Sequence, residues 1–207
     1  MNKDIINKVD KYYTDKIREY GTTSKGVDWN GKASHFLRFD QLSKVLKEKE
    51  NFSIMDYGCG FGSYIEYLID NNYKDFEYFG FDISDDMIKE AKQKYNMPNI
   101  EFLNSIDSIE AVDYIIASGI FNVKLDTDTK EWEAYIEKTL MSINNKAKKG
   151  FSFNILTSYS DEEYMRPHLF YADPMFYFKL CKERFSRNVA LLHDYDLYEF
   201  TIIVRKV

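Results

Sequence analysis

Three glycines within five residues, Gly58, Gly60 and Gly62, directly follow a short apolar segment at residues 52–56. Glycine has no Cβ and adopts positive φ readily, so such a turn lets the backbone approach a bound ligand closely. The residues that follow, 63–69, carry apolar side chains at helical spacing. This strand–turn–helix unit predicts an open α/β sheet whose ligand site lies at the carboxyl ends of the strands.

The rest of the chain alternates between strand and helix patterns, as expected for a βαβ series. We expect strands at 77–82, 100–103, 112–118 and 150–156, and helices at 85–95, from 128 and at 173–185. Ser84, Asp128 and Asp173 are the predicted N-caps of these helices, and Pro174 fits the first helical position. Two β-rich runs, 189–193 and 198–204, predict a terminal hairpin.

Two amphipathic helices, one beginning near Ile5 and one spanning about Phe36 to Leu46, precede the first strand. We therefore predict a single domain that consists of an N-terminal helical cap at 1–49 and a core at 50–207. An irregular segment at 157–172, rich in Tyr, Asp, Glu and Arg, is predicted to be an insertion in that core.

Composition excludes several classes of protein. The 207 residues are 44% hydrophobic and 17% aromatic, enough for a large core, and two cysteines cannot form a disulfide framework. The mean hydropathy of -0.49 and the absence of a long apolar run argue against a membrane protein. With 34 acidic and 28 basic residues, the net charge of -6 disfavours nucleic acid as a partner. The charged N-terminus lacks a signal-peptide pattern, so we expect a cytoplasmic protein.

Two nucleotide-binding motifs can be tested against the glycine turn. The dinucleotide fingerprint G-x-G-x-x-G fails, because Ser63 stands where its third glycine belongs, and no Gly-Lys-Ser/Thr of a P-loop follows. Asp82 ends the second predicted strand, a position from which a carboxylate can accept hydrogen bonds from a ribose diol. The motif Asp56-x-Gly58-Cys59-Gly60-x-Gly62, with Asp82 beyond it, resembles the class I S-adenosylmethionine-dependent methyltransferases, among them small bacterial members of unassigned substrate.

This resemblance covers about residues 50–207 and implies both fold and cofactor. The fold would be a Rossmann-like, seven-stranded, mostly parallel sheet with an antiparallel C-terminal strand, helices on both faces and an N-terminal helical cap. The cofactor would be S-adenosylmethionine, with S-adenosylhomocysteine as its product. The expected cofactor contacts come from the glycine loop, the ends of the second to fourth strands and the cap: Asp56, Gly58, Cys59, Gly60, Gly62, Asp82, Ile83, Ser105, Ile106, Asp107, Ser118, Gly119, Trp29 and Arg38. Arg38 is a candidate for pairing either with the cofactor carboxylate or with an anionic acceptor.

Residues for the acceptor and for catalysis are predicted from their positions at strand ends and in the insertion. His193 follows the sixth predicted strand and is a candidate general base, with Tyr159 as a second catalytic candidate. The predicted acceptor-binding residues are aromatic or cationic: Phe121, Arg166, His168 and Tyr171. No carboxylate cluster stands at these strand ends, so we expect no metal.

The expected reaction is methyl transfer to a small polar or anionic molecule, at oxygen. Methyltransferases of nucleobase and glutamine amines carry two prolines after the fourth strand, and Gly119 and Ile120 replace them here. Two alternatives stay open: a non-catalytic protein that binds S-adenosylmethionine or S-adenosylhomocysteine, and a methyltransferase for protein or RNA. We expect a monomer or homodimer without a membrane partner.

Overall fold

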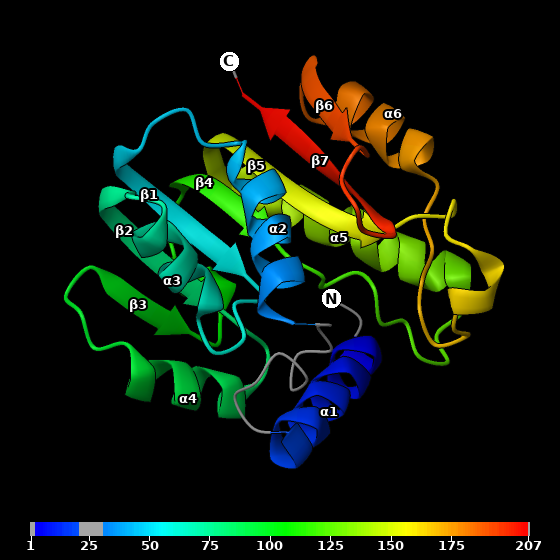
Figure 1. The fold of residues 1–207 in the computed structure, drawn as a ribbon, viewed down its shortest axis with the longest axis horizontal. Helices are drawn as coiled ribbons and strands as arrows, with labels where there is room; N and C mark the ends of the chain where they lie inside the picture. The colour runs from blue at the N-terminus through cyan, green and yellow to red at the C-terminus, as the bar shows by residue number, and fades with distance from the viewer. Residues whose placement is uncertain (1–2, 21–30, 207) are drawn as a thin grey trace.

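Seven strands form one sheet in a computed structural model that describes residues 3–20 and 31–206 (Figure 1). Their order is β3-β2-β1-β4-β5-β7-β6, and β7 is antiparallel to both of its neighbours. The other pairs, from β3 to β5, are parallel. The strands are β1 (Glu50–Tyr57), β2 (Lys74–Phe81), β3 (Ile100–Leu103), β4 (Val112–Ala117), β5 (Ala147–Leu156), β6 (Asn188–Leu192) and β7 (Glu199–Arg205). This confirms the predicted Rossmann-like sheet and its terminal hairpin.

In the described part of the chain, six α-helices accompany the sheet, and in Figure 1 α2 and α3 lie in front of it while α5 lies behind. They are α1 (Lys3–Tyr20), α2 (Lys32–Ser43), α3 (Ser63–Asp70), α4 (Asp85–Lys94), α5 (Thr129–Lys146) and α6 (Pro174–Arg184). The second helix begins and ends earlier than its apolar pattern predicted, because Val45 and Leu46 belong to the turn that leads into β1.

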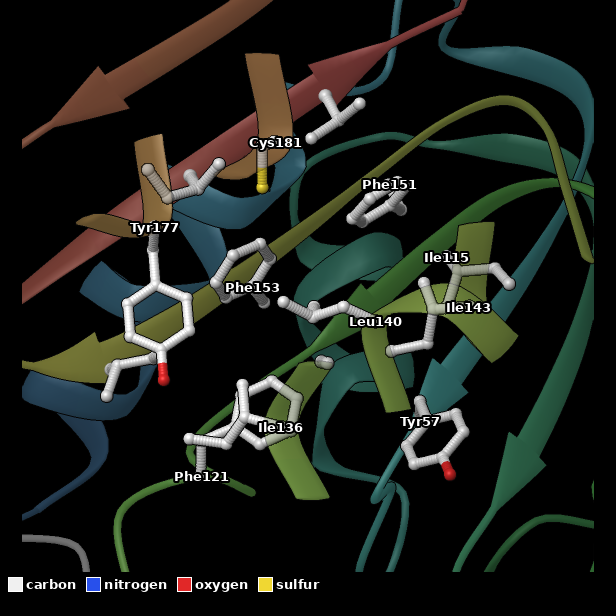
Figure 2. Close-up of a cluster of buried hydrophobic side chains, with 14 of the residues drawn as sticks. Tyr57, Ile115, Phe121, Ile136, Leu140, Ile143, Phe151, Phe153, Tyr177 and Cys181 are labelled. Carbon is white, nitrogen blue, oxygen red and sulfur yellow. The ribbon is translucent and has the colours of Figure 1, made fainter. Parts of the chain in front are cut away.

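Both faces of the sheet are buried, which is why its strands read as nearly continuous apolar runs. One face packs against α5 and α6, where Phe151, Phe153, Leu140 and Tyr177 meet in the main cluster (Figure 2). The opposite face, which carries Ile54 and other alternate strand residues, packs against α2 and α3. Successive strand residues therefore point to different helical layers.

Three helices begin at the N-cap residues that the sequence predicts. The side chains of Ser84, Asp128 and Asp173 each accept hydrogen bonds from backbone amides in the first turn of α4, α5 and α6, and Pro174 opens α6. The insertion at 157–172 contains a 3₁₀ turn at Glu162–Tyr164, and a bridge between Thr157 and Ala172 joins its two ends. A second bridge, between Leu169 and Val123, ties it to the segment after β4.

Helix α1 lies across the carboxyl-end edge of the sheet, in the lower part of Figure 1 to the right of α4. Ile5 and Val9 bury their side chains in the main core cluster, so this helix is packed on the domain. Among the described residues, no helix is both long and apolar enough to span a membrane.

Candidate active site

A cavity opens at the carboxyl ends of β1, β2 and β4, beneath α1 and α2. Most of its wall comes from the glycine loop and from the two strand ends beside it. The lining residues are Val9, Tyr13, His35, Phe39, Asp56, Tyr57, Gly58, Cys59, Gly60, Phe61, Ser63, Phe81, Asp82, Ile83, Met87, Ser118, Gly119, Ile120 and Tyr135. We call it the first cavity.

The glycine loop has the conformation that its sequence predicts. Gly58, Gly60 and Gly62 have φ values of 85°, 52° and 82°, a region that other residues rarely adopt. A Cβ on Gly58 would lie only 2.2 Å from Cγ2 of Ile120. Gly62 is the N-cap of α3 and does not line the cavity. The first two glycines therefore let the loop backbone form the cavity wall.

The carboxylate of Asp82 is held in place by the loop that it faces. One oxygen accepts from the Gly60 amide at 2.8 Å and the other from the Ser84 amide at 2.9 Å. Burial raises the pKa of Asp82, and these backbone bonds oppose the rise. Each oxygen keeps a second lone pair, and the side chain is half-buried at the cavity wall. The group is therefore oriented to accept further hydrogen bonds, as a ribose diol requires.

Asp56 forms a deeper part of the cavity wall and is only 2% exposed. Its Oδ2 accepts a hydrogen bond from the Tyr78 hydroxyl at 2.9 Å. Burial raises the pKa of Asp56 to about 7, the Tyr78 bond lowers it, and the nearby Asp82 raises it further. A cationic ligand in the cavity would favour the ionised form of this carboxyl.

Two polar groups beyond β4 complete this wall. The Oγ of Ser118 is buried and has no hydrogen-bond partner among the described residues. The amide of Gly119 donates to Oδ1 of Asn154 at 2.7 Å, and Asn154 is fully buried on β5. An unpaired buried hydroxyl is costly, so Ser118 is a group that a bound ligand can satisfy.

Helix α2 contributes a neutral histidine to the cavity. Burial, reinforced by the charge of Arg38, lowers the pKa of His35 to about 4. Its ring lies 4.4 Å from that of Phe39, measured between centroids. This corner of the cavity is thus apolar and aromatic at neutral pH.

A second cavity, of about 530 Å³, adjoins the first and shares Tyr13 and Gly119 with it. Its wall combines tyrosines with cationic side chains from α1, α2 and the insertion. The lining residues are Tyr12, Tyr13, Lys16, Arg38, Gly119, Asn122, Val123, Leu156, Ser160, Tyr164, Arg166, His168, Leu169, Tyr171 and Tyr198. The predicted acceptor residues Arg166, His168 and Tyr171 are thus brought together here.

Arg38, predicted to pair with either the cofactor carboxylate or an anionic acceptor, lines the second cavity and not the first. Its Nε lies 2.9 Å and 3.0 Å from the two carboxylate oxygens of Glu199, a fully buried residue on β7. Burial raises the pKa of Glu199, while the Arg38 guanidinium lowers it. The ion pair fixes the guanidinium at the cavity wall.

Several predicted residues lie elsewhere. Phe121 is fully buried in the core cluster of Figure 2, so its side chain cannot contact an acceptor. Ser105 caps a short 3₁₀ helix in which Ile106 faces the core and Asp107 faces solvent, and none of the three lines either cavity. Trp29 lies outside the described residues.

The two catalytic candidates, His193 and Tyr159, contact each other but line neither cavity, with ring centroids 6.0 Å apart. The physical reason is strand order: β6, which His193 follows, is the outermost strand, and both β5 and β7 separate it from β4. Tyr159 is 71% exposed. The structure therefore gives no support to a base at His193.

Sequence reasoning missed most of the apolar wall of the first cavity. Val9, Tyr13, His35 and Phe39 come from the helical cap, and Met87 from the first turn of α4. The spacing of His35 and Phe39, one helical turn apart, placed them on one face without showing what that face covers.

The residues of the first cavity fit S-adenosylmethionine. Asp82 suits a ribose diol, the carboxyl of Asp56 suits a cationic group, and the unpaired Ser118 hydroxyl offers a further polar contact. The apolar Ile83, Met87 and Phe61 suit a nucleobase. In the described part of the chain, no cluster of three or more His, Cys, Asp or Glu side chains could hold a metal ion.

Comparison with known proteins agrees with this fit. The sequence model of a family described as a methyltransferase domain matches residues 48–185. A Mycobacterium tuberculosis protein named "Putative methyltransferase Rv1506c" is 47% identical over 164 residues, which are 79% of this chain and 98% of that protein.

Solved structures share the fold at low sequence identity. The magnesium protoporphyrin IX methyltransferase ChlM from Synechocystis PCC 6803, with bound SAM, matches with a TM-score of 0.64 and 17% identity over 97% of each chain. The same enzyme with bound SAH gives a TM-score of 0.67 and 15% identity over 100% of each chain.

Proposed function

The chain belongs to the family of S-adenosylmethionine-dependent methyltransferases, and from this premise we propose that it methylates an oxygen atom of a small anionic molecule. The first cavity would hold the cofactor and the second the acceptor. One observation carries the proposal: a cavity suited to S-adenosylmethionine adjoins a cavity that is lined by cationic side chains.

In the first cavity, Asp82 would accept hydrogen bonds from the ribose hydroxyls, and Asp56 would face the cationic end of the cofactor. When bound, S-adenosylmethionine supplies a methyl group already activated by its sulfonium. The chain's task is then to hold donor and acceptor in line, and such positioning can supply about 7–11 kcal/mol.

In the second cavity, Lys16 and Arg166 carry positive charges that would attract an anion, while Arg38, paired with Glu199, and His168 can donate hydrogen bonds to it. Arg166 is anchored by its own backbone and side chain: its amide donates to the Tyr171 hydroxyl at 2.9 Å, and its guanidinium donates to the Glu163 carbonyl at 3.0 Å. A carboxylate or phosphoryl group is the ligand that this lining would bind best. A volume of about 530 Å³ suits a small molecule.

Oxygen is favoured as the methylated atom because an ionised carboxylate or phosphoryl oxygen needs no general base. The positions of His193 and Tyr159 outside both cavities agree with a transfer that uses none. The residues of the second cavity would instead orient the acceptor oxygen toward the first.

The test supplies S-adenosylmethionine with a labelled methyl group, together with a size-fractionated cell extract. We expect label below about 1 kDa, lost on treatment of the acceptor fraction with a carboxylate- or phosphate-blocking reagent. Arg166→Gln should lower this labelling about 10-fold or more, whereas Arg187→Gln, at an exposed arginine outside both cavities, should not change it.

Other results would contradict the proposal. Label in protein or RNA would identify a macromolecular acceptor. Tight binding of S-adenosylmethionine without transfer to any fraction would identify a non-catalytic binder.

A further inference from the structure

Tyr13 stands between the two cavities. Both cavities are lined by Tyr13 and Gly119, and glycine has no side chain, so within the described residues Tyr13 supplies the one side chain that borders both. We propose that Tyr13 is a specificity-determining residue whose ring limits the size of the passage through which the methyl group reaches the acceptor.

Helix α1 is fastened on both sides of this passage, which gives the Tyr13 ring a defined place. The Thr14 hydroxyl hydrogen-bonds that of Ser84, the N-cap of α4, at 3.2 Å. Lys8 forms an ion pair with Asp126, in the segment after β4, at 2.8 Å. The helix therefore bridges the loops that follow β2 and β4, and Tyr13 lies on the stretch between Lys8 and Thr14.

The Tyr13 ring is itself packed. It contacts the cluster of Phe61 and Met87 in the first cavity and meets the ring of Tyr12 edge to face, with centroids 5.3 Å apart and planes at 84°. A half-buried ring with such neighbours loses little conformational entropy on ligand binding. It can thus act as a fixed wall of the passage.

The opposite wall is backbone. Gly119 has a φ of 72°, and its amide is held by Oδ1 of the fully buried Asn154 at 2.7 Å. This side of the passage cannot retreat without breaking a buried hydrogen bond. Of the two residues that border both cavities, Tyr13 is then the one whose replacement changes the width of the passage.

This inference rests on the proposed function, because the proposed function places the methyl group on the cofactor sulfur where the first and second cavities meet. It predicts that the ring of Tyr13 discriminates against a larger group on that sulfur. In a hydrophobic pocket, a misfit of about one methylene group changes such discrimination by about 10–200-fold.

The experiment measures binding of two ligands by calorimetry: S-adenosylhomocysteine, which has no third sulfur substituent, and an S-adenosylmethionine analogue with benzyl in place of methyl. The measured quantity is the ratio of their dissociation constants. We expect Tyr13→Ala to shift this ratio toward the benzyl analogue by about 10-fold or more. Tyr13→Phe, which keeps the ring, and Tyr164→Ala, at a tyrosine that lines only the second cavity, should leave the ratio within about 3-fold of the unmodified chain.

A purely structural role for Tyr13 would weaken both ligands equally and leave the ratio unchanged in Tyr13→Ala, and that result would overturn the inference. An equal shift in Tyr164→Ala would also overturn it, because the passage would not be set by Tyr13. Failure of the unmodified chain to bind S-adenosylhomocysteine would instead contradict the proposed function.

Discussion

The amide of Gly119 donates a hydrogen bond to Oδ1 of Asn154, with 2.7 Å between nitrogen and oxygen. This bond ties the turn after β4 to the interior of β5, at the point where the two cavities meet. The side chain of Asn154 also lies beside the carboxyl group of Glu199 and lowers its pKa. A buried amide is thus placed where it holds the shared wall of both cavities.

Replacing Asn154 should therefore affect both stability and ligand binding. Asn154→Ala leaves the Gly119 amide without its acceptor, which costs about 1–3 kcal/mol of unfolding free energy. We also expect weaker binding of S-adenosylhomocysteine. Urea unfolding and calorimetry measure the two effects, and Asn104→Ala, at an exposed residue that bonds to Asp85, is the control. Equal stability of both variants would show that the bond does not hold this turn.

Gly58→Ala should destabilise the glycine loop for two separable reasons. The φ of 85° disfavours alanine, and the new Cβ would lie 2.2 Å from Cγ2 of Ile120. We expect a loss of about 1–3 kcal/mol of unfolding free energy. Gly31→Ala, at φ 138° with no atom within 4 Å, isolates the backbone cost. Adding Ile120→Ala to Gly58→Ala should restore part of the loss, and no restoration would contradict the steric account.

Breaking the Arg38–Glu199 pair should be strongly destabilising. Arg38→Met leaves the carboxylate of Glu199 fully buried and unpaired, which costs about 3–5 kcal/mol. The double variant Arg38→Met with Glu199→Leu should cost clearly less than the sum of its single changes. The exposed Lys8–Asp126 pair serves as a comparison, and breaking it should change stability little because solvent screens both charges. Additive losses at Arg38 and Glu199 would contradict a coupled buried pair.

The pH dependence of stability should carry a contribution from Asp56. Burial raises its pKa from 3.8 to about 7 in the folded chain. Between these values the folded state binds a proton that the unfolded chain releases, so this group lowers the unfolding free energy as pH rises from about 4 to about 7. Above that range its contribution is constant.

Asp56→Asn removes the titration while keeping an oxygen that can accept from Tyr78. As the pH rises from 5 to 8, the unfolding free energy of the unmodified chain should therefore fall relative to that of Asp56→Asn. Urea unfolding at several pH values measures it. Parallel curves for the two proteins would show that Asp56 titrates normally.

Local chemistry in the sequence was enough to predict the alternation of strands and helices. Ser84, Asp128 and Asp173 cap helices as predicted, and the positive φ of Gly58 follows from its place after a strand. These features depend on a few neighbouring residues, so they are readable from sequence. The terminal hairpin was also predictable, because its two strands are adjacent in the chain.

Features set by contacts between distant residues were not predictable. The partner of Arg38 is Glu199, 161 positions away, and no local pattern indicates that pairing. The distance of His193 from both cavities was not predictable either, because strand order, and not chain order, decides which strand ends face the cavities. The amphipathic pattern of α1 predicted a helix, yet only its docking across the strand ends shows that Tyr13 borders both cavities.

The central claim, that the first cavity holds the cofactor through Asp82, is tested most directly by calorimetric titration with S-adenosylhomocysteine. The unmodified chain should bind one molecule, and Asp82→Ala should bind it about 10-fold more weakly or worse, because hydrogen bonds to a charged acceptor are lost. Asp85→Ala, three residues along at an exposed carboxylate, should bind as the unmodified chain does, with thermal unfolding confirming that all three proteins fold. Equal affinity of Asp82→Ala and the unmodified chain would contradict the account.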